Sequence, residues 1–257
     1  MEFVSVTIED HVATVTLDRP PVNAATTQVL RELRDTFRAF TDDKDVRVAI
    51  FRAAGERAFI AGIDLKSIDE GGADAAPLIL DRGVIVREAM WSIYDCAVPV
   101  IAAVNGPAIG LGLALAALCD IIVAADTATF STTEINVGLL GAGSHLGLLL
   151  PRHKVRELFF TGEAISAAEL HRLGAVRAVV PQSELQATAM ELARSLAGKS
   201  PVALRLAKES LNRTEFLPLK DAYRTEQDYT NRLLGFEDAK EARAAFFERR
   251  PPEWKWR

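Results

Sequence analysis

The sequence predicts an α/β protein with a largely parallel sheet, followed by a helical C-terminal part. Short β-branched runs alternate with segments whose apolar residues recur at helical spacing, which is typical of a parallel sheet covered by helices. No strand pattern is found after about residue 200. The composition is globular, with 49% hydrophobic and 25% charged residues. A chain of 257 residues is also long enough to bury a core without a disulfide or metal.

The first half of the chain supplies strands and helices in turn. Two alternating runs, 3–8 and 12–17, predict a β-hairpin. The stretch 97–119 has the length of a membrane span and one polar side chain, Asn105, but glycines and prolines divide it into a buried strand, a turn and a helix. Further elements are expected as helices over 26–40 and 78–94 and as strands over 46–51, 98–104 and 121–124.

From Ser166 onward the pattern predicts helices. Ser166 with Glu169, and Ser183 with Gln186, have the spacing of capping boxes, and Gly174 stands where the first of these helices should end. Ser200 followed by proline predicts the start of the tail helices. We therefore expect a core over residues 1–199 and a helical subdomain over 200–257.

Charge and residue usage exclude several classes of function. The net charge of −5 gives no basic surface for nucleic acid. The two cysteines, Cys96 and Cys119, fit a reducing compartment and argue against a structural zinc, and the four histidines lack ligand spacing, so no metal is expected. The N-terminus has no secretory pattern, which favours a cytoplasmic protein.

Three glycine-containing turns are candidates for ligand contact. In 105–112 a strand runs into a turn and a helix, whose free N–H groups would stabilise a negatively charged oxygen or would simply allow close packing. The segment 57–66 supplies a second turn of this kind, and two such turns can aim two N–H groups at one oxygen. The third turn, 141–147, has GxGxxxG spacing and suggests a nucleotide-dependent oxidoreductase, although it does not follow the first strong strand.

Several motifs follow one another along nearly the whole chain. They are Leu17-Asp-Arg-Pro20 with Asn23-Ala24, Ala58-Phe59-x-Ala61-Gly62-x-Asp64-Leu65, Ala103-Val-Asn-Gly-Pro-Ala-Ile-Gly110-x-Gly112, Cys119-Asp120, Phe130-x-x-x-Glu134, Phe160-Thr-Gly162 and the tail around Phe246. In their order and separation these motifs resemble the enoyl-CoA hydratase/isomerase (crotonase) superfamily. This resemblance implies a spiral of ββα units with a helical C-terminal region, an acyl-CoA thioester substrate, no cofactor beyond its CoA moiety, and assembly as a homotrimer or homohexamer.

The resemblance assigns an oxyanion hole to the backbone N–H groups of Ile63 and Leu111, where Leu111 replaces a glycine common in the family. Two aimed N–H donors stabilise enolate charge on the thioester oxygen. Hydratases of the family hold water between two glutamates. Glu134 matches one of them, and the other position is Ala114, so we expect Glu134 to act as the acid/base and hydration to be slow.

Other interpretations remain open at this stage. Single-glutamate isomerases of the superfamily need only the Glu134 position, and hydrolases of the superfamily place a catalytic histidine near His145. A non-catalytic acyl-CoA binder is a further alternative, suggested by Ala114. For CoA, the resemblance points to Arg57, Ala61 and Lys66 near the first turn and to Phe246 in the tail, which is expected to close the CoA site. The acyl group is not specified, because its pocket, expected over 78–91, contains no motif.

Overall fold

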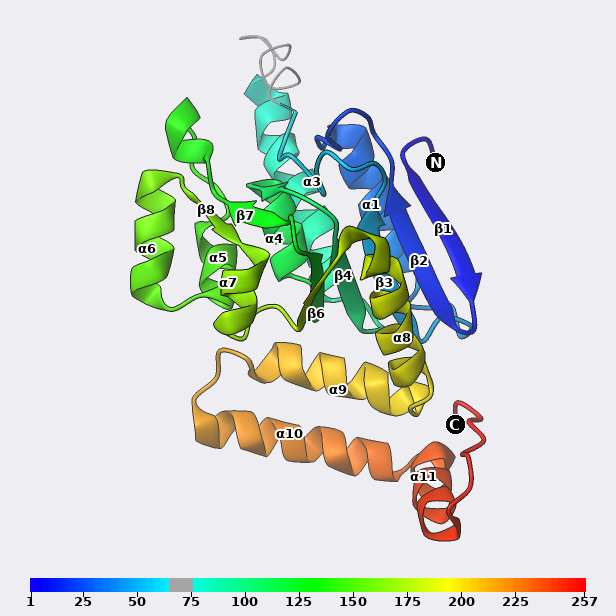
Figure 1. The fold of residues 1–257 in the computed structure, drawn as a ribbon. Coiled ribbons are helices and arrows are strands. Elements are labelled where there is room, and N and C mark those ends of the chain that lie inside the picture. Colours follow the sequence, from blue (N-terminus) through cyan, green and yellow to red (C-terminus); the bar gives the residue numbers. More distant parts are fainter. Residues whose placement is uncertain (65–75) are drawn as a thin grey trace.

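The protein is described by a computed structural model covering residues 1–64 and 76–257, with the backbone alone for 76–82. A six-stranded sheet runs through the larger part of the molecule in the order β1-β2-β3-β4-β6-β9 (Figure 1). β1 and β2 form the antiparallel hairpin, and every other neighbouring pair is parallel. The strands are β1 Val4–Glu9, β2 Val12–Leu17, β3 Val48–Ala53, β4 Val100–Val104, β6 Ile121–Ala125 and β9 Ala178–Val180.

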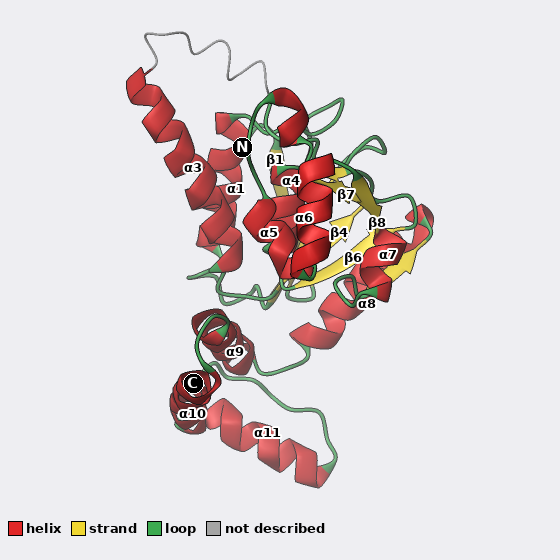
Figure 2. Cartoon of the chain, turned by 90° about the vertical axis from the view of Figure 1, so that its left-hand side faces the viewer, coloured by secondary structure: helices red, strands yellow, loops and turns green. Residues whose placement is uncertain are grey.

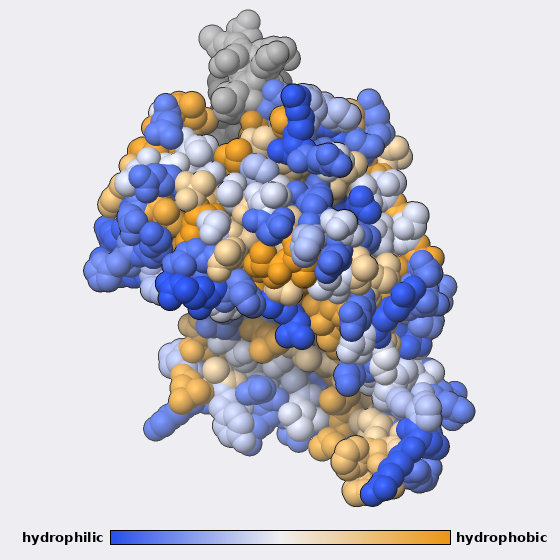
Figure 3. All heavy atoms as spheres, in the orientation of Figure 1, coloured by the Kyte–Doolittle hydropathy of each residue, from blue (hydrophilic) through white to orange (hydrophobic). Residues whose placement is uncertain are grey.

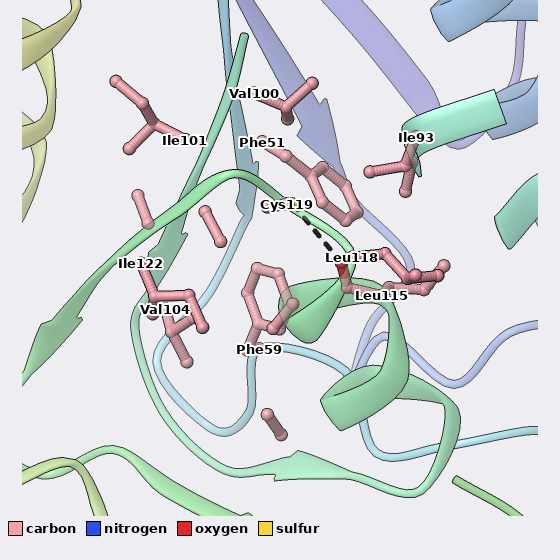
Figure 4. Packing of buried hydrophobic residues seen from close by; sticks show 14 of the residues in the cluster. Phe51, Phe59, Ile93, Val100, Ile101, Val104, Leu115, Leu118, Cys119 and Ile122 are labelled. Atoms are coloured by element: carbon pink, nitrogen blue, oxygen red, sulfur yellow. Dashed lines mark hydrogen bonds between the residues drawn. The ribbon is translucent and has the colours of Figure 1, made fainter. Parts of the chain in front are cut away.

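Helices cover both faces of this sheet. Figure 2 shows α1 (Thr27–Ala39) and α3 (Ala76–Tyr94) on one side and α8 (Leu185–Ala197) on the other. The core between α1 and the sheet contains Phe37, Phe51 and Phe59, whose rings meet edge to face at 5.7 and 5.4 Å between centroids. Figure 4 shows Phe51 and Phe59 beside the end of α4 (Leu111–Ala117), where the Cys119 thiol donates to the Leu115 carbonyl at 3.3 Å.

A second, three-stranded sheet borders the cavity that forms the candidate active site. Its order is β5-β7-β8, and an isolated bridge from Ile60 to Ala108 joins it to the segment after β3. The strands are β5 Ala108–Ile109, β7 Thr129–Ser131 and β8 Ala164–Ser166, and the nearby helices are α4 Leu111–Ala117, α5 Gly143–Leu149, α6 Arg152–Thr161 and α7 Ala167–Arg172.

The last helices lie below the sheet-bearing part in both ribbon views (Figures 1 and 2). They are α9 Pro201–Thr214, α10 Leu219–Leu234 and α11 Glu237–Glu248. Helices α9 and α10 pack on each other around a small apolar cluster of Val202, Leu206 and Tyr229. Figure 3 shows further hydrophobic side chains exposed over these helices, in the lower part of the view. The division of the chain at residue 200 into two domains stays a prediction.

Most predicted elements are confirmed, including the hairpin, α1, and the strand, turn and helix within 97–119. Ser166 caps α7 by accepting from the Glu169 N–H at 3.2 Å, and Ser200 caps α9 by accepting from the Ala203 N–H at 3.2 Å. None of the helices in the described part combines the length and the apolarity needed to cross a bilayer.

Two expectations for 166–199 are wrong. Ser183 does not cap a helix, because it lies inside a 3-10 turn, η3 (Gln182–Glu184), and α8 follows Glu184 without a side-chain cap among the described residues. The region is also not purely helical, since β9 extends the main sheet beside β6. A three-residue strand is too short to produce a periodic pattern, and its pairing with β6 exists only in the folded chain.

Candidate active site

A largely apolar cavity of about 380 Å³ opens where the small sheet, α3, α4 and the 134–142 segment meet. Cavities of this size hold small molecules or the reacting part of larger ones. Glu134 is the one ionisable side chain among the described residues of its wall. The lining comprises Ala61, Gly62, Ile63, Val86, Met90, Ile109, Gly110, Leu111, Ala114, Thr133, Glu134, Val137, Leu139, Leu140, Gly141 and Ala142.

The start of α4 forms one edge of the cavity. Gly110 precedes the helix with a φ of +54°, a left-handed conformation that glycine adopts without strain. The first bond inside the helix runs from the Ala114 N–H to the Gly110 carbonyl at 3.0 Å. The N–H groups of residues 111–113 therefore have no acceptor within α4. Leu111 itself needs no left-handed backbone, because Gly110 makes the turn.

The Ile63 loop forms the neighbouring edge. Ala25 pairs with both peptides around Ile63: its N–H donates to the Gly62 carbonyl at 2.8 Å, and its carbonyl accepts from the Asp64 N–H at 2.9 Å. This pairing does not use the Ile63 N–H. The two edges are in close contact, because the Ile109 N–H donates to the Ile60 carbonyl at 2.9 Å.

Gly112 allows this close approach of the two edges. A Cβ added to Gly112 would overlap the Ile60 carbonyl, which is backbone and has little room to move. The structure thus brings the two expected donors, Ile63 and Leu111, to one cavity on loops that touch.

Glu134 follows β7 and begins the 3-10 turn η2 (Glu134–Val137). Its carboxylate lies between two glycines: a Cβ on Gly110 would overlap Oε1, and a Cβ on Gly141 would lie 2.9 Å from it. Oε2 is buried and finds no hydrogen-bond partner among the described residues. Burial raises the pKa of the Glu134 carboxyl, and a hydrogen bond from its own backbone N–H offsets part of that rise. A partly buried carboxylate with a free oxygen and a raised pKa is suited to accept a proton from a ligand in the cavity.

Ala114 occupies the position where the resemblance to hydratases expects a second glutamate, and it makes this part of the cavity wall apolar. Ala114 is fully buried, lines the cavity and lies one helical turn after Gly110. His145 lies in the first turn of α5, where burial lowers its imidazole pKa. Its Nδ1 is buried without a partner in the described part of the chain, but the described lining of the cavity does not include His145.

The expected CoA contacts are only partly brought together. Ala61 lines the cavity, whereas Arg57 is exposed on the surface before it. Phe246 is 78% exposed on α11 and is not part of the described lining. Lys66 lies outside the described residues. In the tail, Arg257 is ion-paired with Glu237 at 2.9 Å within the same chain.

Sequence reasoning missed part of the cavity wall, and its nucleotide-binding interpretation of the 141–147 glycines does not fit the structure. Val86 and Met90 fall within the expected 78–91 range, but Val137, Leu139 and Leu140 come from a segment without a periodic pattern. The 141–147 glycine run follows η2 and enters α5, so it lacks the preceding strand of a dinucleotide-binding loop. No group of three or more residues suited to hold a metal ion occurs in the part of the chain that the structure describes.

Comparisons with known proteins give a consistent result. The family model for enoyl-CoA hydratase/isomerase matches residues 7–257. A relative from Mycobacterium tuberculosis, named (7aS)-7a-methyl-1,5-dioxo-2,3,5,6,7,7a-hexahydro-1H-indene-carboxyl-CoA hydrolase, is 39% identical over 97% of this chain and 100% of its own. Carnitinyl-CoA dehydratase from Escherichia coli is 39% identical over 100% and 99% of the two chains. The crystal structure of an enoyl-CoA hydratase from Bacillus anthracis superposes with a TM-score of 0.92 at 31% identity, covering 99% of each chain.

Proposed function

Because the chain belongs to the enoyl-CoA hydratase/isomerase family, we propose that this crotonase-fold enzyme moves a proton on the acyl group of a CoA thioester with Glu134 as its acid/base. The observation that carries the proposal is the Glu134 carboxylate, which faces an apolar cavity with one buried, unpartnered oxygen among the described residues. The Ile63 and Leu111 loops border the same cavity.

In the proposed reaction, the Glu134 carboxylate removes a proton from the α-carbon of a 3-enoyl thioester, or from the γ-carbon of a 2-enoyl thioester, which is joined to the carbonyl through the double bond. The electron pair left on carbon delocalises onto the thioester oxygen, and the N–H groups of Ile63 and Leu111 stabilise that enolate. Glu134 then returns the proton at the other end of the conjugated system. Atoms and charge balance without a cofactor, and the product is the double-bond isomer.

Hydration is expected to be slow in this mechanism. A second carboxylate would orient and deprotonate the attacking water, and the methyl group of Ala114 can do neither. The loss of one general acid or base typically costs about 10²- to 10⁴-fold in rate. Isomerisation or proton exchange is therefore favoured over hydration.

The test is Glu134→Gln, which keeps the side-chain shape but removes its basicity. Exchange of the α- and γ-protons of the acyl chain with deuterium oxide, followed by mass spectrometry on a panel of enoyl-CoAs, should fall by at least about 10²-fold, while acyl-CoA affinity changes little. Glu163→Gln, at an exposed position, is the matched control and should keep full exchange. Undiminished exchange in Glu134→Gln would refute the assignment.

A second candidate function is hydrolysis of an acyl-CoA substrate, with His145 as the catalytic residue. Two observations favour it: the buried His145 Nδ1 has no partner among the described residues, and the Mycobacterium tuberculosis relative is named as a CoA hydrolase. His145→Ala separates the two candidates. The single-glutamate mechanism expects this variant to retain proton exchange, and the hydrolase mechanism expects it to be inactive on its substrate while Glu134→Gln is not.

For the CoA moiety we propose a path past Ala61, with Arg57 near its phosphates and Phe246 as part of a closing contact. Arg57 is exposed and so is available to a phosphate. The exposed Phe246 is available to a neighbouring subunit's site in a homotrimer or homohexamer. Arg57→Ala should weaken CoA binding without changing the proton exchange rate at saturation, as measured by calorimetry and exchange kinetics.

A further inference from the structure

The loop between β2 and α1, residues 18–26, is hydrogen-bonded to the Ile63 loop, and none of its residues belongs to the described lining of the cavity. Arg19 makes the first link: its Nη2 donates to Asp64 Oδ2 at 2.8 Å, and its Nη1 donates to the Ala24 carbonyl at 2.9 Å. The Arg19 and Asp64 side chains are 25% and 20% exposed. A guanidinium can bridge two acceptors in this way because its donors have a fixed fork geometry.

Asn23 makes the second link. It is 3% exposed and adopts a φ of +55°, which is uncommon for a residue other than glycine. Its Oδ1 accepts from the Arg19 N–H at 2.9 Å, and its Nδ2 donates to the Ala54 and Ala58 carbonyls at 2.9 and 3.1 Å. Asn23 therefore ties the loop to the start of the segment that leads to Ile63.

Both links restrain the peptide of Ile63, whose N–H is a proposed oxyanion donor. Ala25, at the end of the same loop, is bonded to the carbonyl of Gly62 and the N–H of Asp64, which flank Ile63. A displacement of the loop would therefore rotate the Ile63 N–H. An oxyanion donor is effective only when it is aimed at the place where charge develops, so a small rotation lowers the rate more than it lowers substrate binding.

On the premise of the oxyanion hole proposed above, we infer that Arg19 and Asn23 are positioning residues that aim the Ile63 N–H at the thioester oxygen. Neither belongs to the described lining of the cavity. Their role is thus distinct from substrate contact, and it predicts a loss in kcat rather than in KM.

Two variants test this inference. Arg19→Lys keeps the charge but replaces the fork by a single ammonium, and Asn23→Gly tolerates the left-handed backbone but removes the amide. Each should lower kcat for proton exchange by about 10- to 100-fold and change KM by less than about 3-fold. The matched control is Arg34→Lys, because the Arg34–Glu88 pair has the same 2.8 Å separation and similar exposure, 22% and 35%, between α1 and α3.

A spectroscopic readout separates positioning from a general loss of structure. With butyryl-CoA labelled with ¹³C at its carbonyl, isotope-edited infrared difference spectra should show a lowered carbonyl frequency on the wild-type protein. The band should return toward its solution frequency in Arg19→Lys and Asn23→Gly, and it should stay lowered in Arg34→Lys.

The outcomes distinguish this inference from the function on which it rests. A wild-type spectrum without a lowered band would overturn the oxyanion hole itself, and the inference with it. A lowered band that persists in both Arg19→Lys and Asn23→Gly, together with unchanged kcat, would overturn the positioning role alone. A simultaneous loss in Arg34→Lys would show that the effect is a general loss of structure, which also contradicts the inference.

Discussion

Two ionisable groups away from the surface, the buried Lys208 and the half-buried Glu134, have opposite surroundings. Lys208, on α9, is 4% exposed, and its ammonium donates to Asp120 Oδ2 at 2.7 Å and to the carbonyls of Ile93 and Val98 at 3.2 and 3.3 Å. All three ammonium donors thus have acceptors. Glu134, at the cavity, has a buried carboxylate oxygen without any partner among the described residues.

The two sets of surroundings fit two different roles, a structural one for Lys208 and the proposed acid/base role for Glu134. Lys208 and Asp120 join α9 to the ends of α3 and β4, since Asp120 Oδ2 also accepts from the Val100 N–H at 2.7 Å. A buried charge with every partner in place fixes one arrangement of two elements. A buried carboxylate oxygen left without a partner costs stability, and such a cost is common where a group must be free to react. An ionisable side chain shielded from water therefore has a structural role in Lys208, whereas for Glu134 it supports the proposed acid/base role.

The largest effect should come from breaking the satisfied pair. Asp120→Ala leaves the Lys208 ammonium buried without a counter-charge, and we expect the free energy of unfolding to fall by about 3 kcal/mol or more. Urea denaturation measures this loss. Glu157→Ala is the control, because the Lys154–Glu157 pair has a similar 2.8 Å separation on the surface and should contribute less than about 1 kcal/mol. Equal losses in the two variants would contradict the comparison.

An intermediate effect should follow when the glycines beside Glu134 are filled. Gly110→Ala introduces a methyl group that overlaps the carboxylate at a position with positive φ, so it should lower proton exchange by about 10-fold or more and stability by about 1 to 2 kcal/mol. Gly138→Ala is a matched control, because Gly138 has a φ of +70° but no atom within 4 Å of the added Cβ.

The two glycine variants should therefore lose similar stability, whereas only Gly110→Ala should lose activity. Gly141→Ala adds a third measurement, since Gly141 also contacts Glu134 but lacks the positive φ. It should lower exchange with a smaller loss of stability. Full activity in both Gly110→Ala and Gly141→Ala would mean that the Glu134 position is not critical.

How much the sequence predicts depends on whether the signal is local. Helix α1 and the β1–β2 hairpin have periodic apolar residues, and Ser166 and Ser200 have local capping partners, so all were predictable. Strand β9 was not predictable, because its three residues form a strand only through their pairing with β6 in the folded chain. Ser183 has the spacing of a capping box, but the chain forms a 3-10 turn there.

The site follows the same rule. Glu134 is a single carboxylate in an irregular segment, and only the family resemblance marks it. Its enclosure between Gly110 and Gly141 depends on segments about 24 and 7 residues away in the chain meeting in space, which composition and spacing cannot show. The same holds for Arg19, whose bond to Asp64 spans 45 positions.

The smallest effect, and the sharpest test of the comparison, concerns the stability of Glu134→Gln. Burial raises the Glu134 pKa in the folded protein above its value in the unfolded chain. Between these two values the folded protein binds more protons than the unfolded chain, so the free energy of unfolding falls as the pH rises through that interval and stays lower above it.

Glutamine resembles the neutral acid at every pH. Glu134→Gln should therefore raise Tm at pH 7 by about 1 to 3 °C, and this gain should shrink toward zero near pH 3, well below the ordinary glutamate pKa of about 4.3, because the wild-type carboxyl is then mostly protonated in both states. Calorimetry at the two pH values measures the difference, with the exposed Glu163→Gln as the control that should show no such pH dependence. A variant less stable than wild type at pH 7 would mean that the folded protein stabilises the Glu134 carboxylate, as it does the Lys208 pair. Glu134 would then have a structural role and would not be free to accept a proton from a ligand.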